Sequence, residues 1–357
     1  MFLRERIMLR KKGLKAIKRT LLSATGLLLL FLFFPTWTPS IAGENSITRF
    51  EKVKINGAEH QIMIRGMDRN NPVLLFVHGG PGASEIPYVR KYQKEWEKEY
   101  TIVHYDQRGT GKSYHFGEDY SDLTTDVLVD DLLSLTDYVA EELGQSKVLL
   151  AGHSFGTYIG IKAAAKAPEK FHAYIGIGQV SDTVESELDG LNYAILQAQA
   201  EGNAKDANKL EGMRESIETG GVFVPRNLIR KYGGASRLID DNKDYYTGFL
   251  TSTEYNGLDV IRYLLGVKQT QDQLLKEETE YPLPSLVKQL QLPVYFVMGQ
   301  YDYMTSAKAA EHYFDELQAP KKEFVLFEDS AHFPQFEEKE RFLNWLNDTV
   351  SDLRANE

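Results

Sequence analysis

Short apolar runs recur along most of the chain and predict the strands of a buried sheet. Each run is bounded by Gly, Pro or charged residues and is apolar throughout, which is typical of parallel strands covered on both faces. The runs are residues 72–80, 100–107, 147–153, 173–179, 293–300 and 323–329. Before them, the alternating pattern of residues 51–66 is centred on Asn56-Gly57 and predicts an antiparallel hairpin.

Helical patterns separate these strands. Over residues 124–144, Leu128, Leu132, Leu135 and Val139 recur at helical spacing, and Gly144 is placed to end the helix. Residues 338–355 predict a closing helix. Because strands and helices alternate, we expect an α/β fold with a mostly parallel central sheet flanked by helices.

The strand pattern stops between residues 181 and 285. This stretch is charged and helical, with Tyr and Phe scattered through residues 244–255. We therefore predict a helical cap, or lid, at 181–285 that interrupts a core made of residues 43–180 and 286–357. Its size, roughly 100 residues, lies within the usual range for a domain.

The N-terminal residues have the layout of a targeting segment. Residues 1–20 carry eight Lys or Arg and one acid, residues 21–37 carry no charge, and small Ser40 and Ala42 bracket Ile41. This layout predicts a signal peptide or a membrane anchor at residues 1–42. Cleavage after Ala42 and retention as an anchor are equal alternatives. In both cases the positive charge keeps the N-terminus in the cytoplasm and sends the body outward.

Charge and composition exclude several other functions. The net charge is −10, although residues 1–20 alone carry +7, so an acidic body of −17 follows that would repel nucleic acid. The chain has no cysteine, which excludes disulfides, a thiol nucleophile and a thiolate metal site. The "GKS" of residues 111–113 is not a P-loop, because Asp106 stands where the motif needs glycine. We expect no metal and no cofactor, and the sequence does not give the oligomeric state.

Ser154 is the candidate nucleophile. It lies between Gly152 and Gly156 in a GxSxG motif, directly after an apolar strand and before a helical pattern. A strand, a sharp turn and a helix are the context of a nucleophile elbow, where a strained serine leaves no room for side chains on either side. The alternative is a small residue in an ordinary β-to-α turn.

A serine nucleophile needs a histidine base and a carboxylate that orients it. His332 is the best placed of the eight histidines, because it follows the last predicted strand, and ligands bind beyond the carboxyl ends of such sheets. Asp302 follows the preceding strand and gives the order Ser, Asp, His of the α/β-hydrolases. Asp329 and Glu328 are rivals, but they lie too close in sequence to His332.

Acyl transfer also needs donors for the oxyanion. The glycine-rich loop of residues 78–84 follows a buried strand, and its backbone amides have no side chains to block them. Gly80 and Phe155 are the candidate pair. The alternative is that the loop is a plain turn around Pro81.

Five motifs together resemble the prolyl iminopeptidase branch of the α/β-hydrolase fold. They are HGGPG (78–82), YDQRGTGKS (105–113), GHSFGT (152–157), GQYD (299–302) and SAHF (330–333). The resemblance covers about residues 50–350. It implies a triad of Ser154, Asp302 and His332 with oxyanion donors at Gly80 and Phe155, and the release of an N-terminal proline or another residue from short peptides without a cofactor.

One departure from this family and one feature shared with it bear on the substrate. Phe155 stands where the family has Trp beside the nucleophile. The family holds the free amino group of the substrate through cap glutamates, and Glu185 and Glu187 begin the predicted cap here. Two other functions stay open: hydrolysis of esters or lactones by the same triad, and a surface-anchored binding protein on an enzyme fold.

Overall fold

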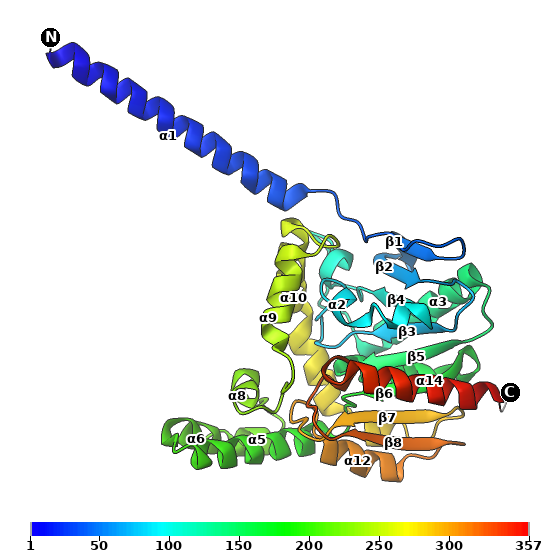
Figure 1. Cartoon of the computed structure of the whole chain (residues 1–357). Coiled ribbons are helices and arrows are strands. Elements are labelled where there is room, and N and C mark those ends of the chain that lie inside the picture. The colour runs from blue at the N-terminus through cyan, green and yellow to red at the C-terminus, as the bar shows by residue number, and fades with distance from the viewer. Residues whose placement is uncertain (1, 356–357) are drawn as a thin grey trace.

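A computed structural model describes residues 2–355, and across them the chain forms one eight-stranded sheet (Figure 1). The strand order is β1-β2-β4-β3-β5-β6-β7-β8. The strands are β1 (Ile47–Ile55), β2 (Ala58–Gly66), β3 (Val73–Val77), β4 (Thr101–Tyr105), β5 (Val148–His153), β6 (Phe171–Ile177), β7 (Val294–Gly299) and β8 (Lys322–Phe327). The β1–β2 and β2–β4 pairs are antiparallel and the other neighbouring pairs are parallel. The predicted mostly parallel sheet is confirmed.

Helices cover both faces of this sheet, and β3 shows how the sequence divides them. Val73, Leu75 and Val77 pack in one core with apolar residues of α3 and α4, while Leu74 and Phe76 pack in a second core with α14. Successive side chains of a strand point to opposite faces, so an apolar run throughout is what burial on both faces requires. The helices of the core are α2 (Arg90–Gln93), α3 (Thr125–Leu143), α4 (Phe155–Lys166), α12 (Ala307–Glu316), α13 (Pro334–Glu337) and α14 (Lys339–Ala355).

Local signals place the turns where they were expected. Asn56 and Gly57 both have positive φ, 47° and 83°, as the two-residue turn between β1 and β2 demands. Gly144 ends α3 in the left-handed conformation, and its amide donates to the carbonyls of Ala140 and Glu141.

The segment between β6 and β7 is helical in the described residues. Its helices are α5 (Thr183–Ala200), α6 (Ala204–Glu211), α7 (Arg214–Glu218), α8 (Arg226–Lys231), α9 (Asp241–Thr251), α10 (Gly257–Glu280) and α11 (Leu283–Leu286). This segment lies beside the carboxyl ends of the strands, because its side chains line the same cavities as the residues that follow β5 and β8. The domain boundaries at 43, 181 and 286 stay a prediction.

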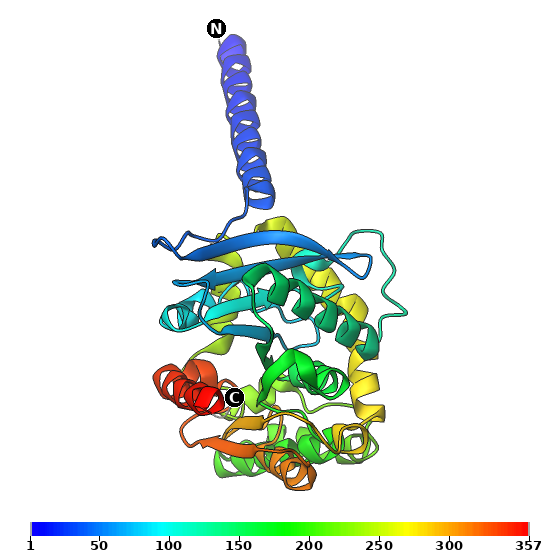
Figure 2. The same cartoon turned by 90° about the vertical axis from the view of Figure 1, so that its right-hand side faces the viewer.

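The N-terminal helix α1 (Phe2–Phe33) projects away from this body in both views (Figures 1 and 2). Residues 13–33 form a 21-residue stretch with a mean hydropathy of 1.6, long and apolar enough to cross a membrane, and none of it is buried in the protein. A signal sequence and a membrane anchor share these properties.

Candidate active site

Ser154 lies on the sharp turn between β5 and α4. Its backbone has φ 55° and ψ −129°, a strained conformation for a residue with a side chain. A Cβ at Gly152 would come within 2.6 Å of the Gly156 carbonyl oxygen, and one at Gly156 would overlap the Val77 carbonyl oxygen. The glycines on both sides of Ser154 are therefore required by close backbone packing, which a plain turn does not need.

His332 and Asp302 form a buried pair at the ends of β8 and β7. The Nδ1 atom of His332 lies 2.9 Å from Oδ2 of Asp302. Oδ1 of Asp302 accepts hydrogen bonds from the amides of Met304 (2.9 Å) and Thr305 (3.0 Å), and the Thr305 hydroxyl donates to Oδ2 (3.0 Å). These donors fix the carboxylate, so the imidazole presents its other nitrogen, Nε2, away from Asp302.

The backbone of His332 is held from two sides. Its amide donates to the carbonyl of Ala235 in the helical segment (3.0 Å), and its carbonyl lies 3.0 Å from Nε2 of His153. Gly178, after β6, leaves room for the ring, because a Cβ there would lie 2.9 Å from His332 Nδ1. Ser154 and His332 line one cavity of about 270 Å³. The structure thus brings the three predicted catalytic side chains to one end of the sheet.

Gly80 and Phe155 also reach this point. The loop after β3 passes directly beside the serine, since a Cβ at Gly79 would lie 2.7 Å from the Ser154 Cβ. The amide of Phe155 belongs to the first turn of α4, where N–H groups have no partner within the helix. Gly80, Ser154 and Phe155 line a second cavity of about 370 Å³. Their position supports the predicted oxyanion role.

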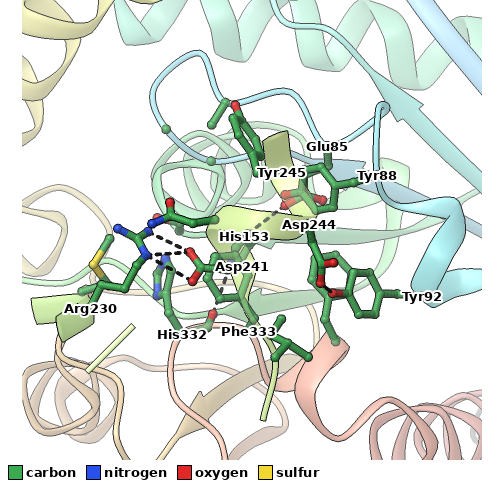
Figure 3. Close-up of a pocket in the computed structure, with 18 of the residues that line it drawn as sticks. Glu85, Tyr88, Tyr92, His153, Arg230, Asp241, Asp244, Tyr245, His332 and Phe333 are labelled. Atoms are coloured by element: carbon green, nitrogen blue, oxygen red, sulfur yellow. Dashed lines mark hydrogen bonds and ion pairs between the residues drawn. The ribbon is translucent and has the colours of Figure 1, made fainter. Parts of the chain in front are cut away.

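The two cavities meet at Ser154 and differ in their linings. The first is lined by His332, by tyrosines from several elements and by three acids, Glu85, Asp241 and Asp244 (Figure 3). The second is lined by the oxyanion candidates and by four charged residues, which are Glu187, Arg226, Arg230 and Glu278. In the part of the chain that the structure describes, no group of three or more His, Asp or Glu is arranged to hold a metal ion.

The two predicted cap glutamates have different surroundings. Glu187 is buried in the second cavity, where it accepts hydrogen bonds from the Val224 amide (2.7 Å) and from Arg226 (2.5 Å). Glu185 is partly exposed, pairs with His312 at 2.6 Å and lines neither cavity. Only Glu187 is therefore placed beside Ser154, and the position of Glu185 does not support substrate binding. The difference arises because these residues lie on different faces of α5.

Sequence reasoning missed three side chains at this site. Thr305 touches both Asp302 and His332, and Glu278 lies in the second cavity. Glu85 lines the first cavity and contacts His153. Thr305 follows Asp302 by three residues, so a local turn around the carboxylate was a usable signal. Glu278 and Glu85 are brought in by tertiary packing.

Glu85 and His153 form a buried pair that supports the backbone of His332. His153 Nδ1 lies 2.8 Å from Glu85 Oε1. Because the His332 carbonyl only accepts, Nε2 of His153 must carry a proton. Burial lowers the pKa of His153, but the hydrogen bond and charge of Glu85 outweigh it and raise that pKa above its usual value. Burial alone would raise the pKa of Glu85, but the hydrogen bond and charge of His153 outweigh burial and lower that pKa below its usual value.

Glu85→Gln should therefore destabilise the fold by about 1–3 kcal/mol. The raised pKa of His153 contributes stability below its unfolded value of 6.5, and the lowered pKa of Glu85 contributes it above 4.5. The loss in the free energy of unfolding, measured in urea, should therefore be largest between pH 4.5 and pH 6.5. It should become smaller as the pH rises through the folded pKa of His153. Glu59→Gln, at an exposed pair with Lys52, is the control and should change little. A deficit that does not vary with pH would contradict the charged pair.

Comparison with known proteins identifies the family of this chain. Residues 72–339 match the α/β hydrolase fold family. This chain belongs to the α/β-hydrolase fold family. The predicted fold is confirmed, and the chain is a hydrolase.

Comparison with individual proteins shows which members of the family this chain resembles. The hydrolase is 31% identical to the "Probable aminopeptidase YbaC" of Bacillus subtilis over 319 residues, which cover 86% of this chain and 98% of the relative. The crystal structure of the proline iminopeptidase of Mycobacterium smegmatis matches with a TM-score of 0.61 at 15% identity, covering 86% and 98% of the two chains. A bacterial membrane phospholipase A matches with a TM-score of 0.59 at 17% identity, covering 98% and 99%. The predicted resemblance to prolyl iminopeptidases is confirmed.

Proposed function

We propose that this hydrolase is a serine aminopeptidase that releases the N-terminal residue, proline or another, from short peptides. Ser154 Oγ attacks the carbonyl carbon of the first residue while Nε2 of His332 takes its proton. The amides of Gly80 and Phe155 hold the oxyanion. His332 then gives the proton to the leaving amine, and a water molecule, activated by the same imidazole, hydrolyses the acyl-enzyme. No metal or cofactor takes part in this proposal.

One observation carries the choice of an aminopeptidase over other acyl hydrolases: Glu278, a buried acid that forms no ion pair with any described residue, lines the cavity beside Ser154. Arg226 pairs with Glu187, and Arg230 pairs with Asp241. Glu278 is buried, and its hydrogen-bond donor among the described residues is the Thr183 hydroxyl at 3.2 Å. The ammonium group of a peptide would supply the missing cation. Glu278 thus joins Glu187 as a candidate for binding the substrate amine.

Replacement of Glu278 by Gln tests this role. Burial raises the pKa of Glu278 to about 7, so its ionised fraction increases as the pH rises from 6 to 8. For an aminoacyl 4-nitroanilide we expect KM to fall over this range, and kcat/KM of Glu278→Gln to be about 10- to 150-fold lower at pH 7.5, which corresponds to a charge-assisted hydrogen bond of about 1.5–3 kcal/mol. The pH dependence of KM should be lost with it.

Two further substrates and one control variant separate recognition of the substrate amine from the acyl-transfer reaction itself. The N-acetylated anilide should be a poor substrate for both proteins, and a simple 4-nitrophenyl acyl ester should be hydrolysed equally by both. Glu280→Gln changes an exposed carboxyl of the same helix, paired with Lys276 at 3.5 Å, and should leave all rates unchanged. Rapid turnover of esters and blocked amides with no preference for a free amine would support the ester or lactone hydrolase instead.

We also propose that α1 crosses the membrane. The eight cations within residues 1–20 favour the cytoplasmic side, and the uncharged residues after them have the length of a span. The membrane phospholipase A that this chain resembles in structure covers 98% of it, α1 included. The catalytic body would then work outside the cytoplasm.

A further inference from the structure

The segment between α1 and β1, residues 34–42, belongs to the folded body. We call it the strap. Arg65 of β2 donates to the Thr38 hydroxyl (2.7 Å) and to the Pro39 carbonyl (2.6 Å), and Thr38 is buried. The same guanidinium pairs with Glu97 at 2.6 Å. Removal of the strap would leave donors of a buried cation without partners, which is costly.

The strap also ties the sheet to the helical segment. Lys112, whose ammonium pairs with Asp259 at 2.5 Å, donates to the Thr36 hydroxyl at 2.9 Å. The Trp37 amide donates to the Thr253 carbonyl (2.9 Å), and the Asn256 side chain donates to the Phe34 carbonyl (3.0 Å). These contacts bind the strap to the corner where α9 ends and α10 begins. Both views show this yellow-green corner directly beneath the base of α1 (Figures 1 and 2).

Large apolar side chains are exposed at this corner. Gly257, the first residue of α10, packs against the Phe31 side chain of α1. Ile261 and Leu264 come four and seven residues after Gly257. They therefore lie on the same face of α10 as Gly257, the face that meets α1 at the first residue of α10. The exposed fractions are 60% for Leu264, 68% for Leu250 at the end of α9 and 52% for Trp37. We call Trp37, Leu250, Ile261 and Leu264 the collar.

We propose that α1 stays attached and that the collar rests on the outer surface of the bilayer that α1 crosses. This inference relies on α1 being a membrane span, and it is independent of the substrate. Trp37 follows the last residue of the span by four positions, so covalent geometry keeps it within about 14 Å of the hydrocarbon edge. The hydrogen bond from Trp37 to Thr253 holds the α9–α10 corner at the same depth.

The collar has the chemistry that a membrane interface accepts. Tryptophan is enriched at the boundary between headgroups and acyl chains, and leucine and isoleucine gain free energy by leaving water there. Leu250 on α9 and Leu264 on α10 leave apolar surface in water on both helices of this corner, and exposed apolar surface of this kind marks interaction sites. Because the strap joins the collar covalently to α1, the bilayer that α1 crosses lies next to the collar. Any other partner would have to displace the bilayer from this surface.

The absence of cysteine from the chain makes a direct test possible. Leu250→Cys and Leu264→Cys each introduce one thiol for a nitrobenzoxadiazole label. Leu326→Cys, at an exposed position of β8 on the other edge of the sheet, is the control. The full chain is reconstituted in phosphatidylcholine vesicles with or without lipids spin-labelled near the headgroup. We expect at least a twofold loss of emission from the labels at 250 and 264 and none from the label at 326.

Three outcomes would overturn the proposal. Unquenched labels at 250 and 264 in protein that remains in the vesicles would show an anchored body whose collar does not touch lipid. Thiol cross-linking of the collar between copies, without quenching, would show that a second copy covers it. Protein isolated from the expression host with Gly43 as its first residue would show that the leader is removed. None of these readouts depends on hydrolysis, so failure of the proposed activity would be recognised separately.

Discussion

Replacing Ser154 by alanine is expected to lower kcat for an aminoacyl 4-nitroanilide by about 10⁶-fold, the loss seen when a serine protease loses its nucleophile. The oxygen that forms the acyl-enzyme is lost with the hydroxyl of Ser154. Residual turnover would come from the oxyanion donors and binding alone. Initial rates measured at high enzyme concentration give the size of the loss.

The fold should survive this change. Alanine keeps the Cβ, so the strained backbone at position 154, with φ of 55°, is no better and no worse tolerated. Equal thermal unfolding, loss of covalent labelling by a fluorophosphonate, and full activity of the exposed control Ser351→Ala would together assign the effect to the hydroxyl. Undiminished hydrolysis by Ser154→Ala, after purification from a host that lacks related hydrolases, would end the case for a serine enzyme.

The sheet, and the meeting of Ser154, Asp302 and His332 at one end of it, could be predicted because their signals are local. Residues buried on both faces of a strand must be apolar throughout, as β3 and β5 are, and the chain order of the strands places their carboxyl ends at one edge. Gly152 and Gly156 mark Ser154 further, because a Cβ at either position would clash with the neighbouring backbone. His332 and Asp302 follow from the requirement that base and acid lie after strands of the same sheet.

The acids proposed to bind the substrate amine could be predicted only in part, because the packing of a helical insertion decides which side chains are buried. The sequence pointed to Glu187 but not to Glu278, although both line the cavity beside Ser154. In the acidic run of residues 277–280, Glu277 binds the amide of Thr125 at 2.9 Å, Glu278 turns into the cavity, and Glu280 is exposed. Nothing in the composition of this run distinguishes the three. Glu185 was expected at the site and lies outside it for the same reason.

Asp302→Asn should lower kcat by about 10⁴-fold, the loss recorded for the same change in a protease triad. The structure gives the reason. Two backbone amides, of Met304 and Thr305, donate to Oδ1, so the asparagine must place its carbonyl oxygen there and its NH₂ group toward His332. That NH₂ donates, so Nδ1 of the imidazole must accept. The ring proton then sits on Nε2, the nitrogen that has to receive the proton from Ser154.

A matched variant separates this tautomer effect from a general loss of charge. Glu185→Gln makes the same carboxylate-to-amide change at a carboxyl–imidazole pair with His312, but outside both cavities, and it should leave kcat unchanged. In Asp302→Asn the KM should stay nearly constant, since ground-state binding does not involve the tautomer, and the loss should appear in kcat. A fall confined to KM, or a kcat within tenfold of the parent, would mean that Asp302 does not orient the base. The neighbouring acids Glu328 and Asp329 would then have to be tested in its place.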